Sequence, residues 1–146
     1  MKWNWEKRQS VAFNILKEVM STPPVLCHYS SELEIGLATD ASAYGVGAVL
    51  FHIMTDGTEK PIAFASQTLN SAQKNYAQIE KEAYGIVFGV TKFRQYLYGR
   101  KFTLVTDHKP LLALFGSDKP IPDRTSSRLQ RWAMILMGND IDGLFV

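Results

Sequence analysis

The 146-residue sequence is poor in the residues that build disulfides and zinc clusters. Cys27 is the single cysteine, which excludes a disulfide within one chain and a zinc site made of several thiolates. The three histidines, His28, His52 and His108, lie far apart and lack the spacing of a metal-ligand set. The low cysteine and histidine content therefore excludes a disulfide-stabilised small protein and a zinc-cluster protein.

Long apolar runs and a strong net charge are also missing. No stretch approaches the length of a membrane-spanning helix, and residues 1–6 contain no apolar core of a signal peptide. The net charge is only +2, which permits a nucleic-acid partner without requiring one. We expect an intracellular, reducing location, in a compartment that the sequence does not specify.

The sequence does contain enough apolar material for one core. With 46% apolar residues, a chain of this length suits one globular domain and is too short for two. Residues 5–20 show the apolar spacing of a helix, which must end before Pro23-Pro24. The proline pair predicts a boundary between a helical appendage, residues 1–24, and a domain, residues 25–146. A helix that packs on the domain is an equal alternative.

The domain sequence predicts a mixed sheet flanked by helices. Strands are predicted over residues 32–40, 46–51, 61–66, 101–107 and 140–146, with Pro61 at the start of its strand. Short connections, including Asp56-Gly57, make the first three antiparallel. A long helix over 76–97, closed by Gly99, allows a crossover that places the fourth strand parallel to the first. Further helices are predicted over 110–115 and around residues 129–136. The expected fold is α/β with a mixed five-stranded sheet.

Acidic residues mark the ends of two predicted strands. Asp40 and Asp107 each follow a threonine at a strand end, and the long helix between them carries Glu80 and Glu82. If the two strands are adjacent and parallel, both aspartates emerge at one carboxyl edge, where α/β sheets bind ligands. Three acids there predict a metal site. As alternatives, Asp40 would cap a turn and Asp107 a helix, and helical spacing does not separate Glu80 from Glu82.

Seven short blocks occur in a distinctive order along the chain. They are Asp40-Ala41-Ser42, Gly45–Leu50, Pro61–Ser66, Asn75-Tyr76 with Glu80-Lys81-Glu82, Phe93–Gly99, Thr106–Leu111 and Arg128–Trp132. Together these blocks resemble the RNase H domain of gypsy-type LTR-retrotransposon reverse transcriptases, over nearly the whole chain. The segment 1–24 resembles the connector that joins the polymerase portion of such polyproteins to RNase H.

The resemblance implies an RNase H-like fold and hydrolysis of the RNA strand of RNA–DNA hybrids, within a polyprotein that is also an RNA-directed DNA polymerase. It implies two partners, the hybrid and the upstream polymerase domain. In the family pattern the ligand glutamate directly precedes the apolar helical run, which matches Glu82. The implied catalytic and metal-binding residues are therefore Asp40, Glu82 and Asp107.

Phosphodiester hydrolysis at neutral pH is well served by two divalent cations about 3.5–4 Å apart. Mg²⁺ prefers hard oxygen ligands and keeps several waters, so a few carboxylates suffice. We expect two Mg²⁺ ions, for which Mn²⁺ can substitute.

Basic residues of the last predicted helix are candidates for a nucleic-acid contact. Arg124, Arg128 and Arg131 line one edge, where they would contact backbone phosphates or form a solvated face. His108 is expected to be an exposed turn residue, although it could approach a phosphate. Trp132 has core spacing and is expected to be buried.

The C-terminus departs from the family pattern, in which a last helix carries a fourth carboxylate. Aligned without a gap, residues 135–146 match the final strand, and the last helix and fourth acid are missing. Aligned with a deletion, Asp142 is a candidate for that acid. We favour the ungapped alignment. Either way the domain is expected to be truncated, so the alternative function is a catalytically inactive tethering module or a decayed retroelement remnant.

Overall fold

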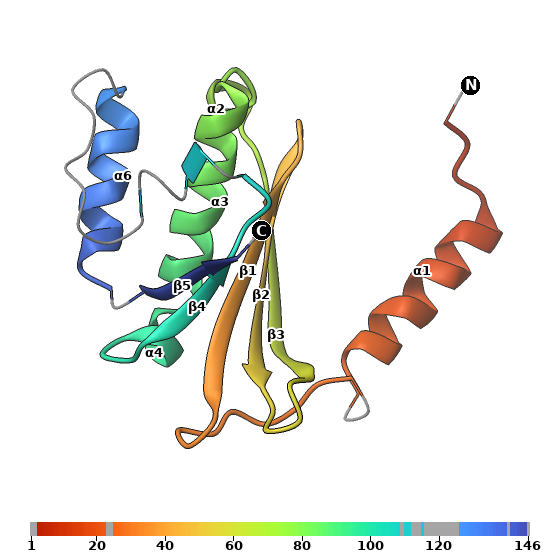
Figure 1. Ribbon diagram of the computed structural model, residues 1–146. Coiled ribbons are helices and arrows are strands. Elements are labelled where there is room, and N and C mark those ends of the chain that lie inside the picture. Colours follow the sequence, from red (N-terminus) through yellow and green to blue (C-terminus); the bar gives the residue numbers. More distant parts are fainter. Residues whose placement is uncertain are drawn as a thin grey trace.

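The computed structural model describes residues 3–22, 25–108, 110–111, 115, 126–139 and 141–145, with side chains as far as Ile141. A sheet carries helices on one face, and one helix stands apart from the sheet (Figure 1). The elements are α1 (Lys7–Met20), β1 (Glu34–Ala41), β2 (Gly45–Ile53), β3 (Glu59–Thr68), α2 (Ser71–Lys74), α3 (Gln78–Lys92), α4 (Arg94–Leu97), β4 (Phe102–Val105), α6 (Ser127–Met137) and β5 (Ile141–Phe145).

The sheet has five strands in the order β3-β2-β1-β4-β5. The pairs β1–β2 and β2–β3 are antiparallel, and β4 lies parallel to β1, as the chain pattern predicts. β5 lies parallel to β4, over residues that the ungapped alignment assigns to the final strand. Ala38 of β1 pairs with Val105 of β4. The residues that follow these two partners therefore reach the same edge of the sheet.

Pro61 lies inside a strand rather than at its start, so that prediction was wrong. β3 begins two residues earlier, at Glu59, and forms an edge of the sheet. The register between β2 and β3 shifts beside Pro61, between Leu50 and Phe51. An edge strand with a local irregularity tolerates proline because it does not need every backbone N–H for pairing.

The predicted helix over 76–97 is interrupted, which is a second correction. Helix α3 ends at Lys92, and Phe93 has φ −103° and ψ 18° before the short α4 begins. Phe93 and Leu97 are both buried, so the break turns the chain toward the core. Gly99 follows with φ 69°, the left-handed conformation expected of a glycine that ends a helix.

Helix α3 lies very close to the sheet. A Cβ atom at Gly89 would lie 3.1–3.3 Å from side-chain atoms of Thr39, Ala48 and Leu37. The core between helices and sheet is apolar and well buried; its members include Ile35, Leu37, Leu50, Ile86, Val90, Leu97, Phe102, Leu104, Leu111, Leu129 and Leu136. This packing fixes the height of α3 above β1.

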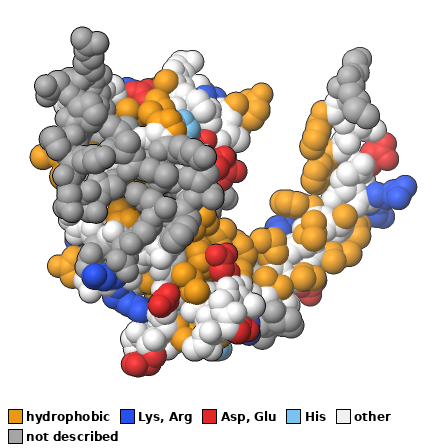
Figure 2. All heavy atoms as spheres, viewed as in Figure 1, with side chains coloured by type: hydrophobic (Ala, Val, Ile, Leu, Met, Phe, Trp, Pro, Cys, Tyr) orange, Lys and Arg blue, Asp and Glu red, His pale blue; other side chains and the backbone are white. Residues whose placement is uncertain are grey.

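The opposite face of the sheet and helix α1 expose apolar surface. No residue of α1 is buried, and Phe13, Leu16 and Val19 are about half exposed. A hollow of about 480 Å³ on the sheet is lined by residues that include Met20, Val49 and Phe64. Figure 2 shows hydrophobic side chains along α1.

The prolines of the predicted boundary, Pro23 and Pro24, lie outside the described residues. Of the predicted helix over 110–115, Pro110, Leu111 and Phe115 are helical, and its other residues also lie outside the described part. None of the described helices is long and apolar enough to cross a membrane.

Candidate metal centre

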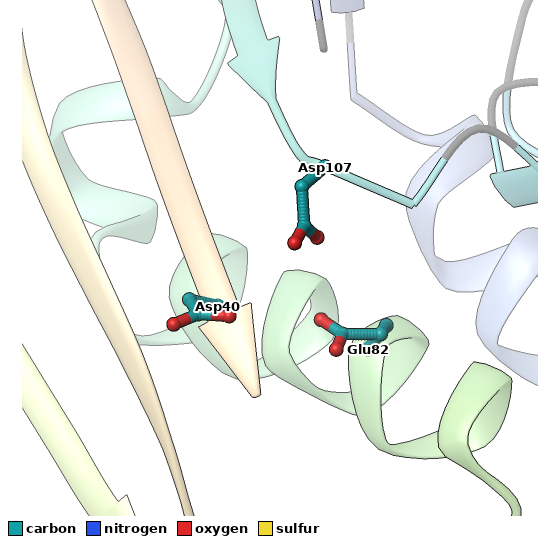
Figure 3. Close-up of side chains that lie close together, drawn as sticks. All are labelled: Asp40, Glu82 and Asp107. Carbon is teal, nitrogen blue, oxygen red and sulfur yellow. The ribbon is translucent and has the colours of Figure 1, made fainter. Parts of the chain in front are cut away.

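Three acidic side chains from three different elements converge at the carboxyl edge of β1 and β4. Asp40 is the penultimate residue of β1, Glu82 lies in the second turn of α3, and Asp107 follows β4 by two residues. One carboxylate oxygen from each lies within 4.8 Å of the other two. The three carboxylates point into a common space between the strand ends and the helix (Figure 3). The structure thus brings together the three acids that the sequence singled out.

The electrostatics of this cluster favour a cation. Glu82 is buried, with 6% of its surface exposed, while Asp40 and Asp107 are exposed. Burial raises the pKa of Glu82, and the negative charges of Asp107 and Asp40 raise it further. A hydrogen bond from Gln78 and the charge of His108 oppose this rise in pKa without cancelling it. A divalent cation among the three carboxylates would relieve the same repulsion.

The donor set also fits the chemistry of Mg²⁺. Carboxylate oxygens are the hard ligands that Mg²⁺ prefers, and the two exposed aspartates leave room for water and a substrate phosphate. Among the described residues, neither His nor Cys joins the three acids within ligand distance. The site is therefore of the oxygen-only type.

Hydrogen bonds connect the end of β1 to Glu82. The Gln78 side-chain amide donates to Glu82 Oε1 at 2.6 Å and to the Ala41 carbonyl at 3.4 Å. The Ala41 N–H donates to Asp40 Oδ1 at 2.9 Å. Sequence reasoning did not single out Gln78; its position four residues before Glu82 on one helix face was the available signal.

Glu80 lies apart from the cluster and has other partners. Its carboxylate forms an ion pair with Arg128 at 3.0 Å and accepts hydrogen bonds from the Ser126 hydroxyl and the Ala77 N–H, both at 3.2 Å. Glu80 thus joins the N-terminal ends of α3 and α6. Geometry separates the two glutamates that helical spacing left equivalent.

His108 differs from its expected state. It is half-buried rather than exposed, and its backbone N–H donates to Thr106 Oγ1 at 3.3 Å. Its Nδ1 atom is buried and has no hydrogen-bond partner among the described residues. Through this hydrogen bond the turn after β4 is tied to Thr106, which is itself buried.

The three arginines predicted to line one edge of the last helix differ in their surroundings. Arg124 lies outside the described residues. Arg128 is half-buried, and its guanidinium lies 4.0 Å from the centre of the Tyr76 ring in addition to its ion pair with Glu80. Arg131 is exposed, and its Nε donates to the Ser127 carbonyl at 3.4 Å.

Trp132 was expected to be buried, but it is only half-buried. Its ring lies 6.1 Å from the Tyr76 ring and 5.9 Å from the Tyr84 ring, between centroids. Trp132 thus packs against the core, as its spacing predicts, and also joins an aromatic cluster at the junction of α3 and α6. Asp142 belongs to β5, but its side chain lies outside the described part.

Comparison with known proteins gives consistent matches. Residues 30–138 match the family described as an RNase H-like domain found in reverse transcriptase. The Transposon Tf2-3 polyprotein of Schizosaccharomyces pombe is 32% identical over 138 residues, covering 93% of this chain and 10% of the polyprotein. The chain thus spans about a tenth of the length of the curated relatives that it matches.

Two solved structures illustrate the shared fold. A foamy viral protease-reverse transcriptase in complex with an RNA/DNA hybrid matches with a TM-score of 0.67 at 16% identity, covering 98% of this chain and 19% of that chain. The N-terminal RNase H domain of a Mycobacterium tuberculosis protein matches with a TM-score of 0.56 at 13% identity, covering 78% and 80%. With the family match over residues 30–138, these findings confirm the predicted resemblance: the chain belongs to the RNase H-like domains found in reverse transcriptases.

Proposed function

We propose that this chain hydrolyses the RNA strand of RNA–DNA hybrids, with divalent cations held by Asp40, Glu82 and Asp107. The observation that carries the proposal is the convergence of three carboxylate oxygens within 4.8 Å at one sheet edge, in a member of this family. Two bound Mg²⁺ ions would supply an activated water and neutralise the charge that develops on the phosphate.

The three acids have different tasks in this proposal. Asp40 and Asp107 are exposed and lie where a substrate phosphate approaches the sheet edge. Glu82 is buried behind them and anchors the cations from the helix side. Arg131, exposed on α6, is proposed to contact backbone phosphates of the hybrid, whereas Arg128 is already committed to Glu80.

We also propose that the chain works as part of a reverse transcriptase polyprotein. The matched Tf2-3 relative is a polyprotein, and the matched foamy viral structure is a reverse transcriptase bound to an RNA/DNA hybrid. The reverse transcriptase match covers 98% of this chain, whereas the RNase H domain match covers 78%. Residues 1–24 are proposed to connect to the polymerase portion, which would cover the exposed apolar face of α1.

The test is cleavage of a hybrid with labelled RNA by the purified chain in Mg²⁺, Mn²⁺ or EDTA. We expect metal-dependent cleavage of the RNA strand, and no cleavage of duplex DNA, duplex RNA or single-stranded RNA. Asp40→Asn should lose the activity. A folded parent chain that cleaves nothing in either cation would refute the proposal and favour the inactive tethering module.

A further inference from the structure

Gln78 is an exposed residue at the first turn of α3, directly beside the metal centre. Its side-chain amide donates a 2.6 Å hydrogen bond to Glu82 Oε1. The same nitrogen lies 3.4 Å from the carbonyl of Ala41, the residue that follows Asp40. One amide therefore contacts both the helix ligand and the strand that carries another ligand.

We propose that Gln78 is a positioning residue that holds Glu82 Oε1 and so fixes the Glu82 carboxylate beside Asp40 and Asp107, where it can bind a divalent cation. The inference rests on the proposed function, because it assigns a role toward the same metal centre. It adds a residue that acts on the cation through Glu82.

Two features make this role specific to Gln78. Among the described residues, Gln78 makes the one side-chain hydrogen bond to the Glu82 carboxylate. Glu82 is almost completely buried, so a carboxylate oxygen without a donor would carry a desolvation cost. The long glutamate side chain also has several rotamers, and the amide selects the one in which the carboxylate meets the two aspartates.

The link to Ala41 gives the amide a second task. The Ala41 N–H binds Asp40 Oδ1, and the Ala41 carbonyl accepts from Gln78. The short path from Asp40 through Ala41 and Gln78 to Glu82 ties the strand ligand to the helix ligand. Without the amide, the Glu82 carboxylate should adopt more orientations and lie at more variable distances from Asp40.

The opposite role makes an opposite prediction. If a bound cation had to displace Gln78 from Glu82, the amide would compete with the metal, and its removal would tighten binding. If Gln78 positions the carboxylate, its hydrogen bond persists beside the cation and its removal weakens binding. The sign of the change in metal affinity therefore separates positioning from competition.

The experiment measures Mn²⁺ and Mg²⁺ binding by titration calorimetry, without substrate, for the parent chain and Gln78→Met. Methionine has a similar length and helix propensity but no N–H to donate. We expect the dissociation constant to rise about tenfold to a hundredfold, as for other partners of metal ligands. Gln78→Ala, which also lacks a donor, should show the same direction of change.

Gln95→Met in α4 is the matched control. Gln95 is exposed and lies on another helix, so metal affinity should equal that of the parent. Circular dichroism melting in EDTA checks that the Gln78 variants keep the fold. Hybrid cleavage at saturating Mg²⁺ should recover toward the parent kcat with an unchanged KM for hybrid, because all three ligands remain.

The outcomes are distinguishable. Unchanged or tighter metal binding in both Gln78 variants, with normal binding and cleavage by the parent, would overturn the positioning role alone. A parent chain that binds no divalent cation would overturn the proposed function and this inference together. Weaker binding by the Gln78 variants but not by Gln95→Met would support the positioning role.

Discussion

Replacing Asp40 by asparagine should separate two effects of the acid cluster, the charge repulsion that destabilises the metal-free fold and the proposed metal binding. Asparagine keeps the shape of the side chain and an oxygen that can accept the N–H of Ala41, but it removes one negative charge. Metal-free protein then loses two repulsions at the sheet edge, those with Glu82 and Asp107. The variant should be more stable than the parent in EDTA and should not cleave hybrid.

The size of the gain follows from the geometry. At the 4.8 Å limit, two unit charges repel by about 0.9 kcal/mol in water and about 3.5 kcal/mol at an effective dielectric constant of 20. Asp40 is exposed, so the lower figure applies to each of its two neighbours. The free energy of unfolding should therefore rise by about 1–2 kcal/mol, or about 3–7 °C in Tm for a chain of this length.

Adding Mg²⁺ should reverse the order of the two proteins. A cation at a hundred times its dissociation constant stabilises the parent by about 2.7 kcal/mol, and the variant should lose most of this gain. Calorimetric melting in EDTA and in Mg²⁺ measures the crossover, and cleavage of labelled hybrid should fall more than about a hundredfold. Glu59→Gln, on the exposed edge strand β3, is the control and should show neither effect.

Two results would refute this reasoning. A lower Tm for Asp40→Asn in EDTA would show that the carboxylate stabilises the fold rather than opposing it. Cleavage at the parent rate would remove Asp40 from the site altogether.

Four further predictions concern other charged groups. Glu82→Gln should nearly abolish cleavage whereas Glu80→Gln should keep most of it; a reversed order would refute the assignment. Burial raises the pKa of Glu82 above 4.5, so the folded protein holds the carboxyl proton more tightly than the unfolded chain does. The charged form of Glu82 therefore destabilises the fold at neutral pH, and Glu82→Gln should raise Tm in EDTA. This gain in Tm should vanish below about pH 4, where the carboxyl group is protonated in both states. Arg131→Ala, in a cleavage-deficient background, should weaken hybrid binding and lower by about 1 the slope of log binding constant against log salt concentration, without changing Tm. Arg128→Ala should instead lower Tm, because Arg128 pairs with Glu80 and lies on the Tyr76 ring. Fluorescence anisotropy and calorimetry test the two variants, and equal behaviour would contradict the prediction. Arg100 donates to three oxygen atoms of the segment before β1 at 2.8–3.0 Å. Arg100→Ala should therefore lower the free energy of unfolding in urea by about 2–4 kcal/mol, and Arg100→Lys should lower it less. An unchanged urea midpoint would show that these hydrogen bonds do not stabilise the fold.

The position of Asp40 and Asp107 at neighbouring strand ends could be predicted from the sequence, because it depends on local patterns of apolar residues and on the length of the connection. Alternating apolar residues mark β1, a long helix demands a crossover, and a parallel β4 then places Asp107 beside Asp40. Each step uses a strong constraint, either the two-residue period of a strand or the long connection that parallel strands require. Together they locate two of the three acids.

The remaining details depend on packing between segments that are distant along the chain. Glu80 and Glu82 differ in which neighbour they meet, and the neighbour of Glu80 is Arg128, 48 residues away. The break at Phe93 reflects its burial in the core rather than any helix-breaking residue. Trp132 packs against the core, as its helical spacing predicts, yet it stays half-buried, with its ring beside that of Tyr76.

The close seat of α3 on the sheet makes the metal centre sensitive to distant substitutions. The helix that carries Glu82 rests on β1 and β2 through Gly89, where even one added methyl group would lie 3.1–3.3 Å from three side chains. A larger residue there would lift the helix by a few tenths of an ångström or more, comparable with the roughly 0.5 Å tolerance of a functional site. A change at this glycine should therefore disturb the proposed metal centre even when all three acids are kept, so the proposed cleavage depends on the helix–sheet contact as well as on the acids.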